Sequence, residues 1–254
     1  MNKPCFIISH KYYRGYPSYL EHYLDNIQQY YPDALTVVVD NNSVHVDDIW
    51  DKVQGRDNLV LATNTSPRKF EVGAYAYGLD ILRERTILSE CGYIVLTQDT
   101  FILKNKFDFE QLTKDGTYAL PINSMVADGQ CAREARDILT PLGLHDNMDK
   151  IDLVWCNSFA IHPSKADTLC GWLKQIECVN RGQSCASERY LGRILWELNE
   201  RKPCGSSIDG RFGRPEQLQQ EKYDFWTVDP LAPASSYFVK QVQQKNETTR
   251  DTEG

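Results

Sequence analysis

An aspartate interrupts an apolar stretch of this 254-residue chain, from Tyr93 to Leu103. Asp99 follows a run that is typical of a buried strand, and a second apolar run resumes after Thr100. Strand stability does not account for an acid there, because aspartate is disfavoured in sheets and is costly to bury unpaired. A hard divalent cation that bridges Asp99 to a diphosphate would account for it, since such ions prefer carboxylate and phosphate oxygens. A helix cap or a turn-forming aspartate is the alternative interpretation.

Polar residues also follow two earlier apolar runs. Ser9 and His10 end the first run, and Asp40, Asn41, Asn42 and Ser43 follow the second. In an open α/β sheet the carboxyl ends of parallel strands meet at one edge, where such folds bind ligands. These side chains therefore predict a nucleotide site in which Asp40 accepts from a base N–H or a ribose hydroxyl. The alternative is that it only forms an Asx turn.

Two expected helices add further candidates. One opens on the small residues of 73–78, which allow a ligand or a backbone to approach closely and equally suit tight packing on the sheet. Arg68, just before it, can meet a phosphate or remain solvated. In the other helix Glu188 lies one turn before Leu191 and shares its inward apolar face, so it can act as a general base. Favourable placement of an acid at a helix N-terminus is the alternative.

The elements that position these residues alternate along the first hundred positions. We expect strands at 6–9, 35–39, 58–62 and 93–97, and helices at 18–31, 47–54 and 71–89. This alternation predicts a parallel sheet with helices on both faces. The second half is less regular, with strands at 117–121 and 153–161, helices at 133–139, 164–176 and 187–201, and a loop at 203–215. No linker divides the chain, which predicts a single domain over 1–245, with functional halves at 1–104 and 105–245, and a disordered tail at 246–254.

Composition excludes several classes of protein. The formal net charge of −7 disfavours a nucleic-acid-binding protein, which would carry a basic field. No apolar run is long enough to span a membrane, so no transmembrane segment is expected. Neither a G-x-G-x-x-G fingerprint nor a P-loop is present, which disfavours an NAD enzyme and a P-loop kinase.

The pattern of cysteines is evidence on the redox state of the cellular compartment in which the protein resides. Of eight cysteines, Cys5 and Cys156 fall inside apolar strand-like runs, where a buried free thiol is usual. No C-x-x-C pair and no zinc-ligand spacing occurs. We therefore expect reduced structural thiols and a cytoplasmic location.

The strands, strand ends and helices described above, taken in their order along the chain, resemble the GT-A-fold nucleotide-sugar glycosyltransferases. They are most similar to the inverting family 2 enzymes. The resemblance covers residues 4–201, and its most specific part is the Val-Asp-Asn-Asn-Ser segment at 39–43. The other segments that carry it are 6–9, 73–78, 93–100 and 187–190. It implies an α/β fold with a GT-A-like, Rossmann-type, mostly parallel sheet, helices on both faces and a mixed second half that binds the acceptor.

By this resemblance the first half binds a nucleotide-sugar donor, with UDP, GDP or dTDP as the nucleotide. Gln98 and Asp99 stand where the family has its D-x-D motif, and Asp99 is the expected ligand of a divalent cation, Mn²⁺ or Mg²⁺. The chain departs from the family pattern because Gln98 replaces one acid and because no histidine follows His162. The expected donor-binding residues are Ser9, His10, Asp40, Asn42, Arg68, Gly73, Tyr77, Gln98 and Asp99.

The resemblance further implies sugar transfer by a single displacement, with Glu188 as the base that deprotonates a hydroxyl of a glycan or glycoconjugate acceptor. Inversion at the anomeric carbon then follows. The acceptor-binding residues are expected at Trp155, Asn157 and Ser158, and Trp155 and Trp226 are candidates to stack on sugar rings. The alternatives are a retaining GT-A transferase, a sugar nucleotidyltransferase and a non-catalytic carbohydrate-binding relative.

Overall fold

A computed structural model describes residues 3–12, 18–103, 106, 117–125, 129–146, 151–201 and 238–240. A six-stranded sheet runs through them in the order β3-β2-β1-β4-β7-β6. The strands of this sheet are β1 (Lys3–His10), β2 (Leu35–Asp40), β3 (Leu59–Thr63), β4 (Cys91–Gln98), β6 (Thr117–Met125) and β7 (Ile151–Ile161). A separate pair joins β5 (Phe101–Leu103) to β8 (Phe238–Lys240) in antiparallel fashion.

The main sheet is parallel in its first half and antiparallel in its second. Strand β1 pairs in parallel with both β2 and β4, and β2 pairs in parallel with β3. Strand β7 is antiparallel to β4 and to β6. The two halves of the chain therefore share one sheet, and the predicted mixed, mostly parallel α/β fold is confirmed.

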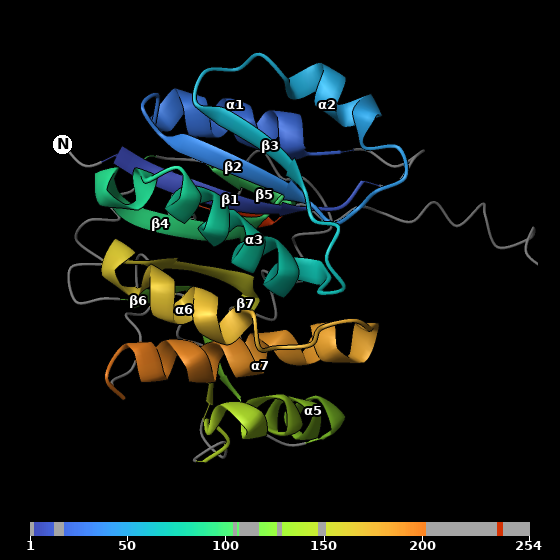
Figure 1. The fold of residues 1–254 in the computed structure, drawn as a ribbon, viewed down its shortest axis with the longest axis vertical. Helices are drawn as coiled ribbons and strands as arrows, with labels where there is room; N and C mark the ends of the chain where they lie inside the picture. Colours follow the sequence, from blue (N-terminus) through green and yellow to red (C-terminus); the bar gives the residue numbers. More distant parts are fainter. Residues whose placement is uncertain are drawn as a thin grey trace, which may run out of the picture.

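Helices cover both faces of this sheet. They are α1 (Leu20–Tyr30), α2 (Asp47–Val53), α3 (Phe70–Glu84), α5 (Gln130–Leu139), α6 (Ala166–Leu173) and α7 (Arg181–Leu198). Short 3₁₀ turns stand at η1 (Ile87–Glu90), η2 (Thr140–Leu142) and η4 (Pro163–Lys165). Figure 1 shows α3 and α6 in front of the sheet, with α7 beside β7 and α5 on the far side of α7, at the end remote from α2.

The buried side chains form two clusters because successive residues of a strand point to opposite faces. In β1, Ile7 faces the cluster of α3, α5, α6 and α7, whereas Phe6 and Ile8 face the cluster of α1 and α2. In β4, Leu96 faces the first cluster and Val95 the second. This alternation fixes the side of the sheet on which each residue at the carboxyl edge lies.

The largest differences from the predicted helix boundaries are at the end of α3 and at the start of α7. The helix expected at 71–89 ends at Glu84, and Thr86 follows with a left-handed φ of 57°. Helix α7 begins at Arg181, earlier than expected, because Asn180 caps it. The Asn180 side chain accepts from the Gln183 N–H, and the Gln183 side chain accepts from the Asn180 N–H, a reciprocal capping box.

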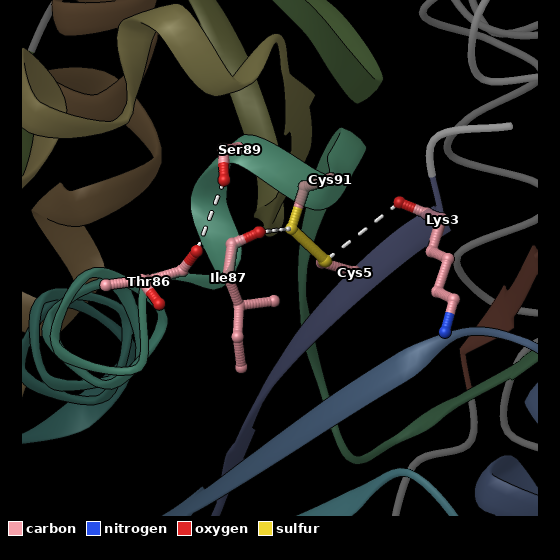
Figure 2. The surroundings of a disulfide bond; sticks show 6 residues. All are labelled: Lys3, Cys5, Thr86, Ile87, Ser89 and Cys91. Atoms are coloured by element: carbon pink, nitrogen blue, oxygen red, sulfur yellow. Dashed lines mark hydrogen bonds between the residues drawn. A yellow bond between two sulfur atoms is a disulfide. The ribbon is translucent and has the colours of Figure 1, made fainter.

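A disulfide joins Cys5 at the start of β1 to Cys91 at the start of β4 (Figure 2). The prediction of reduced thiols is therefore wrong for Cys5, and the inference of a cytoplasmic location loses that support. Cys5 lies within an apolar run as expected, but the β1–β4 pairing brings it to a Cα–Cα distance of 6.0 Å from Cys91. Cys131, Cys170, Cys178 and Cys185 are free thiols. The Cys156 side chain lies outside the described residues.

None of the described helices is both long and apolar enough to cross a bilayer. The expected loop at 203–215, Trp226 and the tail at 246–254 lie outside the described residues. The division of the chain into functional halves stays a prediction.

Candidate functional site at the carboxyl edge of the sheet

Asp99 and His10 form a pair where β4 and β1 end. His10 Nδ1 lies 2.5 Å from Asp99 Oδ2, and the Lys11 N–H donates to the same oxygen at 3.3 Å. The Asp99 side chain is 13% exposed and that of His10 only 1%. The centroid of the Trp50 ring of α2 lies 5.8 Å from the centroid of the His10 imidazole, and the two ring planes are tilted by 33°. The structure thus brings together two residues 89 positions apart that were predicted to bind a donor.

The residues at the end of β2 form a tight loop around Asp40. Both oxygens of this buried carboxylate accept from Ser43, Oδ2 from the backbone N–H and Oδ1 from the hydroxyl, at 2.6 Å each. Local turn-forming bonds of the kind in the alternative interpretation therefore occupy Asp40, although they run to the third residue on rather than to the second as in an Asx turn, and Asp40 shapes the loop that follows β2. Its direct contact with a base or ribose stays a prediction.

That loop presents Asn42 at the surface of the edge, beside Lys11 of the loop that follows β1. Asn42 is exposed and has a left-handed φ of 56°, a conformation that asparagine tolerates better than most residues. The Lys11 ammonium donates to the carbonyls of Asn41 at 2.8 Å and Asn42 at 3.1 Å. Lys11 therefore holds the β1 and β2 loops together.

A chain of amide and hydroxyl groups crosses from β1 to β3. Asn41 Nδ2 donates to Ser9 Oγ at 3.1 Å, and Asn64 Nδ2 donates to Asn41 Oδ1 at 3.3 Å. Asn64 also donates to the Arg68 carbonyl at 2.7 Å. Ser9 is buried and takes its place in this chain, as its strand-end position predicted.

The small residues of α3 are explained by the protein's own packing. A Cβ on Gly73 would stand 2.2 Å from the Arg68 carbonyl oxygen, and one on Gly78 would stand 2.5 Å from Ile7 Cγ2. Close backbone and helix-on-sheet contacts account for both glycines. Tyr77 is 41% exposed, and no hydrogen bond or ring contact among the described residues joins it to the polar edge. The Arg68 guanidinium has a buried Nε without a partner in the described part of the chain.

Gln98 lies on the opposite side of the sheet from Asp99. Its amide nitrogen donates to Glu71 Oε1 of α3 at 2.5 Å, and its carbonyl oxygen accepts from the Thr100 hydroxyl at 3.5 Å. Glu71 is thus a second carboxylate near the β4 end that the sequence did not single out as a site residue. Its position in the first turn of α3 was the available signal, but it also fits an acid stabilised by the helix N-terminus.

Asn157 and Ser158 occupy an irregular part of β7. Leu120 of β6 pairs with Ser158, whereas Ile122 pairs with Val154, so β7 carries extra residues here. Asn157 has a left-handed φ of 53°. Its carbonyl accepts from the Tyr75 hydroxyl at 2.8 Å, and its side-chain oxygen accepts from Ser187 Oγ at 2.8 Å. Bulges of this kind are frequent next to active sites.

Two of the predicted acceptor residues, Asn157 and Ser158, are therefore buried rather than exposed to a cleft. Asn157 is 4% exposed and Ser158 is fully buried. Their contact with an acceptor stays a prediction. The backbone of Trp155 belongs to β7, but its side chain lies outside the described residues.

Glu188 is half-buried in α7, next to the Ser187 that binds Asn157. Because α7 begins at Arg181, Glu188 lies beyond its first turn. The dipole effect at a helix N-terminus fades within one turn, so it does not explain this acid. The general-base role stays a prediction.

Burial also determines the protonation state of Cys178 and Tyr190, two neighbouring residues in the buried cluster that contains α7. Burial raises the pKa of the Cys178 thiol to about 11, partly opposed by Tyr190 and supported by the charge of Glu71. Burial likewise raises the pKa of the Tyr190 phenol well above its usual range. The Tyr190 hydroxyl makes no well-formed hydrogen bond among the described residues. Neither group is an ionised nucleophile at neutral pH.

Asp99 is the carboxylate at this edge that was predicted to hold a divalent cation. Asp40 is bound by Ser43, and Glu71 lies with Gln98 on the opposite side of the sheet. Among the described residues no group of three or more histidine, cysteine, aspartate or glutamate side chains is placed to hold a metal ion. A single carboxylate still suits a Mg²⁺-type ion that takes its remaining ligands from phosphates and water. The hydrogen bonds described for Asp99 fall on Oδ2, which leaves Oδ1 as the candidate ligand.

No family model and no curated protein matches this chain. Among solved structures, the galactosyltransferase LgtC in complex with donor and acceptor sugar analogs is similar at a TM-score of 0.45 and 11% identity, covering 94% of this chain and 86% of that one. An active-site mutant of LgtC is similar at a TM-score of 0.44 and 13% identity, covering 98% and 90%.

Proposed function

We propose that this protein transfers a sugar from a nucleoside-diphosphate sugar to an acceptor hydroxyl. The observation that carries the proposal is the set of polar side chains at one edge of the sheet. Asp99 and His10 lie at the ends of β4 and β1, and Asn41 and Asn64 follow β2 and β3. Open α/β sheets bind ligands at this edge, and the resemblance of residues 4–201 to family 2 glycosyltransferases supports a nucleotide sugar.

The alternation of β4 gives the proposal a definite geometry. Asp99 lies on the α1 and α2 side of the sheet, with His10 and Trp50. Glu188 belongs to α7, which covers the opposite face. A donor whose diphosphate is held at Asp99 and whose sugar reaches Glu188 must therefore lie across the carboxyl ends of β1 and β4.

In this arrangement Asp99 Oδ1 would hold Mn²⁺ or Mg²⁺ against the diphosphate. The bound ion would offset negative charge on the departing nucleoside diphosphate. Glu188 would take the proton of the acceptor hydroxyl as its oxygen attacks the anomeric carbon, which predicts inversion. Proton NMR of the product linkage checks this, and retention of the donor's anomeric configuration would favour the retaining alternative.

Donor hydrolysis tests the Asp99 part of the proposal. The full chain is incubated with UDP-, GDP- and dTDP-sugars and with Mn²⁺ or Mg²⁺, and released nucleotide is measured. We expect slow release with one donor, reduced at least about 100-fold in Asp99→Asn, since loss of one well-placed charge-stabilising group costs about that much. Asp137→Asn, an exposed acid on α5, is the matched control. No release with any donor would contradict the proposal.

The role of Glu188 is tested separately with an acceptor. Glu188→Gln is expected to lower the transfer rate by about 10²–10⁴-fold, because Gln cannot accept a proton. Glu177→Gln, an exposed acid just before α7, should retain the rate. Unchanged function in Glu188→Gln would favour a retaining enzyme or a non-catalytic carbohydrate-binding protein.

A further inference from the structure

A chain of hydrogen-bonded side chains ends at Ser9, and the direction of each bond in it can be assigned. Asn64 Oδ1 accepts from the Ser66 N–H at 3.1 Å, and Asn64 Nδ2 donates to the Arg68 carbonyl at 2.7 Å. Because a backbone N–H only donates and a carbonyl only accepts, both neighbours fix the same orientation of the Asn64 amide. The second hydrogen of Nδ2 is therefore donated to Asn41 Oδ1, at 3.3 Å.

The orientation of Asn64 determines that of Asn41, and through it the role of Ser9. Since Asn41 Oδ1 is an acceptor, Asn41 Nδ2 donates to Ser9 Oγ at 3.1 Å and to the His10 carbonyl at 3.4 Å. A serine hydroxyl has one hydrogen and two lone pairs. Asn41 uses a lone pair of Ser9 Oγ, whereas the Ser9 hydrogen has no acceptor in the part of the chain that the structure describes. The Ser9 hydroxyl is therefore held as a hydrogen-bond donor.

This hydrogen lies where water has little access, because Ser9 is only 6% exposed. A buried donor without an acceptor is rare and costly in folded proteins, so it marks a place where a ligand completes the hydrogen bonding. Arg68, whose carbonyl belongs to the same chain, carries a second such donor, since its buried Nε has no partner among the described residues. Both donors require an acceptor, and the charge of the guanidinium favours an anionic oxygen.

The position of Ser9 favours a phosphate oxygen as that acceptor. The Asp99 N–H donates to the Ser9 carbonyl at 3.0 Å, so Ser9 lies directly beside the residue that is expected to hold the diphosphate. The Ser9 side chain lies on the α3 side of the sheet, as Ile7 does two residues earlier in β1. A diphosphate that crosses the end of β1 from Asp99 towards Glu188 therefore passes Ser9.

We propose that the Ser9 hydroxyl donates a hydrogen bond to a phosphate oxygen of the bound nucleotide, and that Asn41 is the positioning residue that keeps the Ser9 hydrogen available for this contact. The inference rests on the proposed function and deepens it, because it names the group of the donor that Ser9 recognises. Asn64 fixes the orientation of Asn41 and so acts one step further from the ligand.

A series of ligands with increasing numbers of phosphates tests the contact. A nucleoside, its monophosphate and its diphosphate, with uracil or guanine as the base, are titrated into the full chain and into Ser9→Ala at the same Mg²⁺ concentration. Affinities for the nucleotides are measured by calorimetry and those for the nucleoside by NMR. We expect Ser9→Ala to bind the diphosphate about 10- to 100-fold more weakly, since a hydrogen bond to a charged group is lost, and to bind the nucleoside as the unmodified protein does.

Two further variants separate this contact from a change in folding. Ser9→Cys keeps the shape of the side chain but has only a weak S–H donor, so it should show the same loss with the diphosphate. Ser89→Ala, at an exposed position before β4, is the matched control and should bind every ligand normally. An equal loss with the nucleoside would place the Ser9 contact on the base or ribose and overturn the inference, as would no loss with any ligand. If the unmodified protein binds no nucleoside diphosphate, the proposed function fails and the inference fails with it.

A double-mutant cycle tests the role of Asn41. Asn41→Ala should weaken diphosphate binding in the unmodified protein, because the Ser9 hydroxyl is no longer held in one orientation, and should leave nucleoside binding unchanged. In the Ser9→Ala background the same substitution should cause no further loss, since Asn41 acts through Ser9. Losses that add in the double variant, or an equal loss with the nucleoside, would show that Asn41 does not position Ser9 for a phosphate.

Discussion

Arg193 shows how a single buried charge is accommodated in this fold. Its side chain is 2% exposed, and it donates to Glu197 Oε2 at 2.6 Å and to Asp146 Oδ1 at 2.7 Å. Its guanidinium also lies over the Trp196 ring, 4.6 Å from the centroid. The cluster joins α7 to the segment that follows α5, at the end of the molecule remote from α2.

The same cluster predicts an acid-dependent loss of stability. Burial alone would raise the pKa of Glu197, but Arg193 and Arg201 together hold it below its usual value. The hydrogen bond from Arg193 likewise lowers the pKa of Asp146. Both carboxyls therefore bind protons more readily in the unfolded chain. Their stabilising effect is full above about pH 5 and is lost as the pH falls through about 4 and below.

Arg193→Met should lower the free energy of unfolding at neutral pH by about 1–3 kcal/mol, through loss of the Glu197 bond and of packing on Trp196. Measured by urea unfolding, the difference from the unmodified protein should shrink as the pH is lowered below about 4. Glu177→Gln, outside the cluster, should show no such trend. A difference that stays constant with pH would argue against the cluster as its source.

At the scale of elements, the close contact between α3 and β1 depends on a glycine, Gly78. A Cβ at Gly78 would stand 2.5 Å from Ile7 Cγ2, and Ile7 is fully buried at the centre of the sheet. The neighbouring strand cannot yield easily, because protein interiors are close-packed. Gly78 therefore fixes how closely α3 approaches β1, and with it the position of Glu71 beside Gln98.

Gly78→Ala should destabilise the protein by about 1–3 kcal/mol through overpacking, although alanine favours helices. Gly171→Ala in α6 is the matched control, because no atom lies within 4 Å of the added Cβ. The control should raise stability by up to about 1 kcal/mol. Thermal unfolding of the two variants checks the contrast, and an equal effect of both substitutions would contradict the close contact.

At the scale of the whole molecule, the disulfide and the candidate site lie at opposite ends of the same two strands, β1 and β4. Cys5 and Cys91 stand where β1 and β4 begin, and His10 and Asp99 stand where those strands end. The cross-link spans 86 positions and so encloses α1, α2 and the whole of α3, together with β2 and β3. It constrains the unfolded chain over a large part of the parallel half.

Removal of this cross-link through the double variant Cys5→Ala, Cys91→Ala should lower the unfolding free energy by about 4.6 kcal/mol, as the chain-entropy relation gives for a loop of this length. Reductant should lower the midpoint of the unmodified protein towards that of the double variant and leave the variant unchanged. If reductant has no effect on the unmodified protein, the cross-link does not contribute to its stability.

Much of this architecture follows from local sequence. Apolar runs in the first hundred residues set the strands, and helical spacing sets α1, α2 and α3, because these signals depend only on near neighbours. The polar strand ends were enough to predict a site at the carboxyl edge. Parallel strands bring their ends together whatever the details of packing, so His10 and Asp99 could be expected to lie close.

The tertiary structure decided which of those polar groups meet and which face they occupy. Alternation along β4 separates Gln98 from Asp99, and the pairing of Gln98 with Glu71 needed α3 to dock on the sheet. The Cys5–Cys91 bond needed β1 and β4 to become neighbours, although β2 and β3 lie between them in the chain. Contacts between distant residues depend on how whole elements pack, and no pattern among near neighbours encodes that packing.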